Sequence, residues 1–184
     1  MNFNQHSWLV GKHAFLSASK YHWTNYSDDK FEATYLASLE AQRGTELHAL
    51  AAEMIRLGVR PTRTRQTFNL YVNDAIGFGM SPEVVLYYSD DAFGTADAIS
   101  FKKNLLRIHD LKTGKTPTSM TQLEIYAAFF CLEYMVKPGE IQMELRIYQN
   151  DDVTIHIPEV ERIAHLMDRI KFLAKKIQTM KGGL

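Results

Sequence analysis

The sequence predicts a mixed α/β domain, in which helices cover a sheet that has both parallel and antiparallel strands. Three observations indicate it: apolar residues at helical spacing before Gly58, three strand-like runs between residues 83 and 112, and a helix-like run between two further strands. A chain of 184 residues is long enough to bury one core of ordinary size. We therefore expect a single domain over residues 1–184.

Composition and charge exclude several classes of protein. The 21 basic residues balance the 21 acidic ones, so no overall field attracts a polyanion. Cys131 is the only cysteine, which excludes an internal disulfide and any metal cluster held by four cysteines of one chain. No apolar run is long enough to cross a membrane, and the first residues lack the pattern of a secretory signal. We expect a cytoplasmic protein of a bacterial or phage-infected cell, with no membrane partner.

The first half of the chain begins irregularly and continues as a helix. Residues 1–30 are rich in aromatic and polar side chains without periodicity, which favours loops and short helical turns. Residues 32–57 carry apolar side chains such as Ala51 and Ile55 at three-four spacing, which predicts a helix that ends before Gly58.

A loop and four strands are predicted next. The stretch 59–67 is basic and contains a proline, so it predicts a loop. Residues with high strand propensity, bounded by turn residues, predict a short strand over residues 68–72. They then predict an antiparallel meander of three strands, over residues 83–88, 95–102 and 104–112.

The last third alternates between helix and strand. Helical spacing predicts a helix over residues 119–136. Two runs of alternating apolar and polar residues predict strands over residues 141–149 and 153–157, and a helix that starts at a proline is predicted over residues 158–181. A strand, helix and strand in succession normally form a right-handed crossover, so we expect residues 104–112 to lie parallel to residues 141–149.

Two carboxylates and an ammonium stand in the predicted hairpin. Residues two apart in a strand share a face, so Asp110 and Lys112 project together. A hairpin register centred between Lys103 and Asn104 sets Asp97 opposite Asp110. Two carboxylates this close repel each other unless a cation lies between them. Their hard oxygen ligands suit Mg²⁺ or Mn²⁺. The alternative is a plain hairpin whose acids sit at strand ends, with Asp110 paired to Lys112 at the surface.

Four ordered motifs resemble the PD-(D/E)XK nucleases, in the branch of RecB-like and CRISPR-associated exonucleases. That branch has a Gly-x-x-Asp strand, an Asp-x-Lys-Thr-Gly strand end, a helix with Gln-x-x-x-Tyr and an earlier helix with Gly-x-x-x-His. The corresponding segments here are GTAD, IHDLKTG, QLEIY and RGTELH, at residues 94–97, 108–114, 122–126 and 43–48. The resemblance implies a restriction-endonuclease-like core of helix, three-strand meander, helix and strand, with flanking helices.

The resemblance also implies roles for individual residues. Metal ligands would be His48, Asp97, Asp110 and the Leu111 carbonyl; Lys112 would be catalytic, and Gln122 and Tyr126 would hold the site or the DNA. Helical spacing independently places Gln122 and Tyr126 on one face, although Tyr126 in the core and Gln122 at the surface is the plain alternative. His48 likewise has a packing alternative. Glu83 opens a strand and is a further candidate acid.

These roles together imply a metal-dependent deoxyribonuclease, most simply an exonuclease acting in recombination, repair or phage DNA processing. The cofactor would be Mg²⁺ or Mn²⁺, without the iron–sulfur cluster that many members of the branch hold on cysteines. DNA, as single strands or ends, is the expected partner; a homo-oligomer or a recombination or replication protein is compatible with the sequence. Candidate DNA contacts are Arg60, Arg63 and Arg65 for phosphates, and Tyr21, Trp23 and Tyr26 for bases.

Two other functions fit the same residues. A non-catalytic module could keep this fold to bind nucleic acid or a protein, and a structure-specific endonuclease or a nuclease for RNA could use the same site. The joint presence of His48, Asp97, Asp110 and Lys112 favours catalysis, because a silenced copy has no physical reason to keep unpaired acids in a hairpin.

Overall fold

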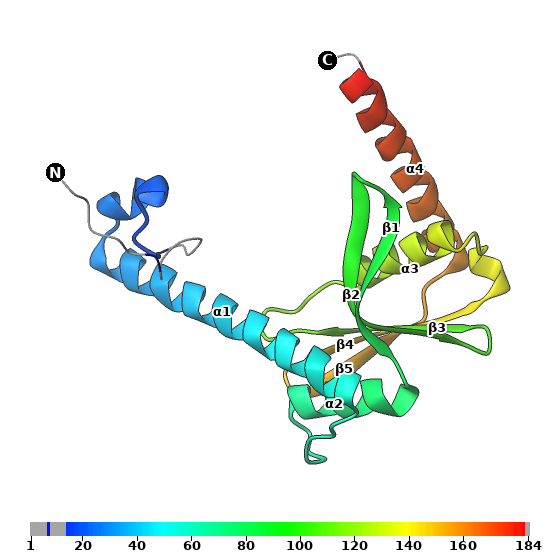
Figure 1. Ribbon diagram of the computed structural model, residues 1–184, viewed down its shortest axis with the longest axis horizontal. Helices are drawn as coiled ribbons and strands as arrows, with labels where there is room; N and C mark the ends of the chain where they lie inside the picture. Colours follow the sequence, from blue (N-terminus) through cyan, green and yellow to red (C-terminus); the bar gives the residue numbers. More distant parts are fainter. Residues whose placement is uncertain (1–6, 8–13, 183–184) are drawn as a thin grey trace. The chain divides into compact units, whose positions relative to one another are not determined.

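The computed structural model of the chain describes residue 7 and residues 14–182 (Figure 1). They form the mixed α/β fold expected from the sequence, with a five-stranded sheet in the order β1-β2-β3-β4-β5. The chain divides into two compact units, residues 1–45 and 46–184. The sheet and every predicted metal-binding or catalytic residue lie in the second unit. That the two units make one domain stays a prediction.

Apart from the predicted strand at residues 68–72, the elements follow the predicted order. The helices are η2 (Ala18–Asn25), α1 (Asp28–Leu57), α2 (Thr67–Phe78), α3 (Thr121–Glu133), η3 (Pro138–Glu140) and α4 (Val160–Gly182). The strands are β1 (Ser81–Ser89), β2 (Ala92–Lys102), β3 (Leu105–Leu111), β4 (Gln142–Gln149) and β5 (Asp152–His156). β1, β2 and β3 form the antiparallel meander, and β3 pairs in parallel with β4, as the crossover rule predicted. No helix among the described residues is long and apolar enough to cross a bilayer.

One predicted element is wrong. Residues 68–72 were expected as a short strand, but they belong to helix α2. The aromatic and branched side chains in this short window imitate a strand, whereas the buried positions Tyr71, Val72 and Ala75 follow one helical face. Gly79 ends the helix in the left-handed conformation, at φ 59°, where glycine carries no steric penalty. Tertiary packing of this face therefore decides the element.

Apolar clusters lie on both faces of the sheet. Side chains of β2, β3 and β4 such as Ile108 and Leu145 pack against α3 and α4 on one face. On the other face, Ala98, Leu111 and Tyr148 pack against α2 and the end of α1. Fully burying a large apolar side chain contributes about 1.5–3 kcal/mol, so these two clusters dominate the stability of the second unit.

The hairpin of β1 and β2 extends past β3. β2 pairs with β1 from Ala92 to Ile99, but with β3 only from Ala98 to Lys102. The outer part of the hairpin, green in Figure 1, is thus a two-stranded ribbon. Side chains of one ribbon face, including Leu86 and Ala96, pack in the cluster that contains α3. The ribbon is therefore covered on that face by a helix that also carries predicted site residues.

A polar network lies between the sheet and α2. The Tyr148 hydroxyl donates to Asp74 at 2.7 Å and lies 3.2 Å from His109 Nδ1. Because the only hydroxyl proton goes to Asp74, Nδ1 of His109 carries the hydrogen in this contact. Its Nε2 is buried without a hydrogen-bond partner among the described residues. Burial, reinforced by Arg146 and Arg107, lowers the pKa of His109 to about 3.

This neutral histidine makes stability depend on pH. The pKa of His109 falls from an ordinary 6.5 to about 3 on folding. Below pH 6.5, His109 binds a proton in the unfolded chain but stays unprotonated in the folded chain. The free energy of unfolding therefore decreases as pH falls toward 3. By pH 5 the loss reaches about 2 kcal/mol. Urea unfolding at pH 7 and pH 5 should show it, and His109→Gln should reduce the difference. The same reduction in the exposed-site control His165→Gln would contradict the assignment.

Candidate active site

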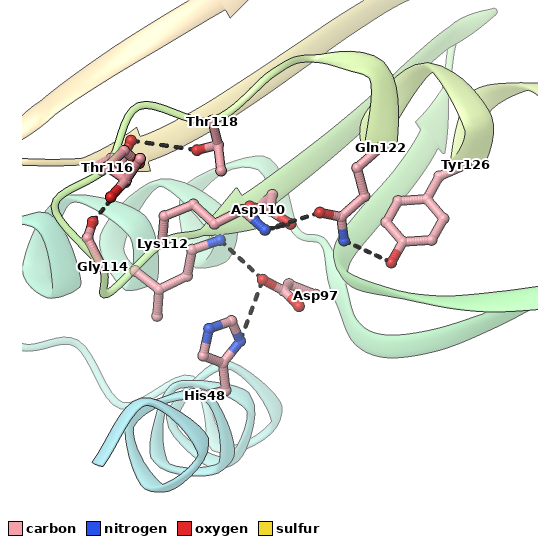
Figure 2. A network of polar contacts seen from close by, with 11 residues as sticks. His48, Asp97, Asp110, Lys112, Gly114, Thr116, Thr118, Gln122 and Tyr126 are labelled. Carbon is pink, nitrogen blue, oxygen red and sulfur yellow. Dashed lines mark hydrogen bonds and ion pairs between the residues drawn. The ribbon is translucent and has the colours of Figure 1, made fainter. Parts of the chain in front are cut away.

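Carboxylates of β2 and β3 meet where the β1–β2 ribbon leaves β3 (Figure 2). The observed register pairs Ala98 with His109 and is the register predicted from the turn. The ladder ends there, one step before Asp97 and Asp110, so their direct pairing stays a prediction. The Leu111 N–H donates to Asp97 Oδ2 at 2.9 Å. The predicted role of the Leu111 carbonyl as a metal ligand stays a prediction.

Three side chains from three elements could hold a metal ion. His48 of α1, Glu83 of β1 and Asp97 of β2 offer ligand atoms that all lie within 4.8 Å of one another. His48 Nδ1 lies 3.3 Å from Asp97 Oδ2, and this contact raises the pKa of His48 against the opposing effect of burial. Glu83, predicted only as an additional acid, is thus a member of the group, whereas Asp110 stands beside it.

Glu83 reaches the group through an unusual backbone conformation. It has φ 52°, in the left-handed region, although it lies within a strand. The ladder pairs its neighbours Pro82 and Val84 with Ala98 and Ala96. A non-glycine residue in this region costs on the order of 1 kcal/mol, and such strain within a strand, away from a turn, is characteristic of functional sites. A sequence pattern of alternating residues gives no sign of this conformation.

Asp110 is a buried carboxylate with an incomplete set of partners. Its side chain is only 2% exposed, and Lys112 Nζ lies 2.9 Å from Oδ2 and 3.1 Å from Oδ1. Only the Oδ1 contact has hydrogen-bond geometry, so Oδ2 is a buried acceptor without a hydrogen bond among the described residues. Burial and the neighbouring Asp97 raise the pKa of Asp110, while Lys112 opposes the rise. The carboxylate therefore sits where more positive charge would be stabilising.

A chain of hydrogen bonds ties Lys112 to α3. Lys112 Nζ donates to Gln122 Oε1 at 2.9 Å, and Gln122 Nε2 donates to the Tyr126 hydroxyl at 2.9 Å. Gln122 and Tyr126 thus use the shared helix face that their spacing predicted. Figure 2 shows this chain running from Asp110 to Tyr126. It fixes the ammonium beside the buried carboxylate.

Gly94 leaves room for the Tyr126 ring. A Cβ at Gly94 would lie 2.8 Å from Cε1 of Tyr126, closer than a real side chain approaches. The glycine of the GTAD motif is therefore explained by close packing of strand β2 against α3. The sequence marked Gly94 only through the family resemblance, because the packing partner is distant in the chain.

The loop after Lys112 is held by a residue that the sequence reasoning missed. Gln149 at the end of β4 donates through Nε2 to the carbonyls of Gly114 and Thr116, and it accepts from the Thr118 hydroxyl. Asn150 donates to the Lys115 carbonyl. The β4–β5 turn thus positions the segment that links Lys112 to Gln122. No short motif could have identified this contact.

The predicted DNA contacts lie outside the metal-capable group. Arg60 and Arg63 line a pocket of about 420 Å³ beside α2, and Arg60 donates to the Asn73 carbonyl. Arg65 is exposed. Tyr21, Trp23 and Tyr26 belong to the first unit, so their relation to the site is not described. Their roles in DNA binding stay predictions.

No model of a known protein family, no curated protein and no solved structure matches the chain. The resemblance to PD-(D/E)XK nucleases therefore stays a prediction, carried by the four motifs. What the structure adds is the spatial arrangement: His48, Glu83, Asp97, Asp110 and Lys112 come together from separate elements.

Metal binding should be measurable apart from any activity. Because His48, Glu83 and Asp97 converge only in the folded chain, Mn²⁺ should raise the melting temperature, by the equivalent of about 2.7 kcal/mol at a hundredfold excess over Kd. Glu83→Gln should abolish most of this rise. Glu161→Gln, a carboxylate removed from α4, serves as the matched control. An equal rise in all three proteins would refute the site.

The contact between Gly94 and Tyr126 predicts a non-additive pair of substitutions. Gly94→Ala should lower the free energy of unfolding by about 1–3 kcal/mol, because the new methyl group overlaps the Tyr126 ring. In a Tyr126→Ala background the same change should cost little. A double-mutant cycle by urea unfolding measures the coupling. Equal costs in both backgrounds would show that the ring does not select the glycine.

Proposed function

We propose that this protein is a metal-dependent deoxyribonuclease that hydrolyses phosphodiester bonds. The observation that carries the proposal is the meeting of the His48, Glu83 and Asp97 group with a buried Asp110 that is paired to Lys112. Ion pairs that only stabilise a fold rarely contain more acids than bases. A site that binds a cation and a phosphate needs such an excess of acids. The ordered motifs that resemble PD-(D/E)XK nucleases support the same function independently.

The donor set suits a hard divalent cation. Carboxylate oxygens with one imidazole match Mn²⁺ or Mg²⁺, and the unbonded Oδ2 of Asp110 provides a further oxygen in the same region. Such a cation supplies Lewis-acid activation of a water molecule and of the scissile phosphate. His48, Glu83 and Asp97 would hold it, with Asp110 as the adjoining oxygen donor.

Lys112 has a separate task in this proposal. Asp110 and Gln122 hold its ammonium in one place. A fixed positive charge beside a phosphate stabilises the negative charge that develops in the transition state. Lys112 is therefore proposed as the catalytic lysine, and Gln122 and Tyr126 as the residues that position it.

The resemblance favours an exonuclease over a sequence-specific endonuclease. Settings consistent with it are recombination, repair and phage DNA processing. The alternative of a binding module without catalysis is weakened by the completeness of the site, because a binding surface does not need a buried carboxylate paired to a fixed ammonium.

Cleavage of end-labelled single- and double-stranded DNA tests the proposal. The wild type should degrade DNA with Mg²⁺ or Mn²⁺ and not with EDTA, while Asp110→Asn and Lys112→Ala should lose about a hundredfold or more in rate. Lys171→Ala on α4, which removes an exposed lysine, is the control that should retain activity. Circular dichroism establishes that the variants fold. Wild-type protein that cleaves no substrate under any metal condition would refute the nuclease.

A further inference from the structure

One face of the β1–β2 ribbon continues outward from the metal-capable group. Alternation along β1 puts Val85 and Tyr87 on one face, and Glu83, whose φ of 52° interrupts the regular strand, stands two residues before Val85. The cross-strand partners of Val85 and Tyr87 are Thr95 and Phe93, which share that face with Asp97 on β2. Val85, Tyr87, Phe93 and Thr95 together form a strip. This strip lies next to Glu83 and Asp97 along the ribbon.

The strip is apolar and open. Phe93 is 58% exposed, Val85 53% and Tyr87 45%, and Thr95 is exposed as well. The opposite ribbon face, with Leu86 and Ala96, is buried in the cluster around α3. Stability of the ribbon thus comes from the covered face. The paired rings of Tyr87 and Phe93 on the other face stabilise the hairpin by about 0.2–1 kcal/mol, yet both stay open to solvent.

We propose that this strip is a stacking platform for the bases of single-stranded nucleic acid whose backbone enters the metal-capable group. The inference rests on the proposed nuclease function and specifies its substrate as an unpaired strand. Bases stack on exposed aromatic side chains with little regard to sequence, because every base has a flat face. The strip offers such rings on the face that carries Asp97.

Distance along the strand fits this occupant. Tyr87 lies four residues from Glu83, which corresponds to about 13 Å at about 3.3 Å per residue. A stacked strand advances about 3.4 Å per nucleotide, so the platform holds bases about four nucleotides from the metal-capable group. A shorter strand that keeps its bases stacked cannot reach both places. The geometry therefore predicts a minimum length for tight binding.

The charges around the strip favour bases over phosphates. None of the four side chains is basic, and Asp90 and Asp91 stand at the tip of the hairpin, where Asp90 accepts from the Tyr87 hydroxyl and Asp91 pairs with Lys181. A duplex presents phosphates outward and keeps its bases stacked inside, so it gains nothing from these rings. An unpaired strand exposes its bases. The strip therefore selects single strands.

Equilibrium binding of fluorescein-labelled oligothymidylate, measured by anisotropy with Ca²⁺ to avoid cleavage, tests the platform. Phe93→Ser should raise the Kd for a strand of about eight nucleotides about tenfold or more, with no such effect on a hairpin duplex. Phe172→Ser is the matched control, since Phe172 on α4 is also 58% exposed. The ratio of Kd values should stay constant between low and moderate salt, because a stacked base releases no counterions. A strand of about three nucleotides should bind equally weakly to the wild type and Phe93→Ser.

The outcomes separate this inference from the nuclease itself. If wild-type protein cleaves DNA but Phe93→Ser binds single strands as the wild type does, the nuclease stands and the platform is refuted. If no cleavage occurs but single-strand affinity still depends on Phe93, the platform stands without the nuclease. Light scattering of both proteins completes the test. A wild-type dimer that Phe93→Ser converts to a monomer, with unchanged DNA affinity, would assign the strip to a second copy of the chain and overturn the proposal.

Discussion

The register of the β2–β3 hairpin is the constraint on which the candidate site depends. Lys103 and Asn104 both have positive φ, at 49° and 63°. Positive φ at both central residues is what a two-residue hairpin turn needs in order to match the twist of its strands. That turn fixes which residues face each other, and it brings Asp97 to Asp110. A slip of one residue would send one carboxylate to the opposite face of the sheet and destroy the pair. Local turn geometry thus determines the position of charges that lie six residues from the turn on either strand.

Bringing two carboxylates together creates an electrostatic demand that the surrounding residues meet only in part. Asp97 is satisfied by the Leu111 N–H and by His48, and Asp110 by the ammonium of Lys112. One buried oxygen of Asp110 still lacks a hydrogen bond among the described residues, and its pKa is raised by burial and by Asp97. A fold selected only for stability would replace such a group with an apolar side chain of similar size. A bound cation, as proposed for the function, would supply the missing positive charge.

Much of this site could be predicted, because its central residues obey local rules. Strand alternation joins Asp110 to Lys112, the turn joins Asp97 to both, and helical spacing joins Gln122 to Tyr126. Glu83 enters the metal-capable group through a positive φ that no alternating pattern encodes, and Gly94 and Gln149 act through contacts with residues far away in the sequence. Helix α2 was missed for the same reason: packing of Tyr71 and Ala75 against the sheet outweighs the strand propensity of a short window.

That missed helix supports the end of β3 that carries Asp110. Alternation sends His109 toward α2 and Asp110 toward the site, so adjacent residues of one strand are buried in opposite polar environments. Tyr148 connects the two sides: its hydroxyl is fixed by Asp74 of α2, while its backbone carbonyl accepts the Lys112 N–H at 2.9 Å. The position of the lysine backbone is therefore coupled to a side-chain network beneath α2, on the opposite face of the sheet. Rigid support from structure beyond the site is what holds a charged group at a fixed distance from its partners.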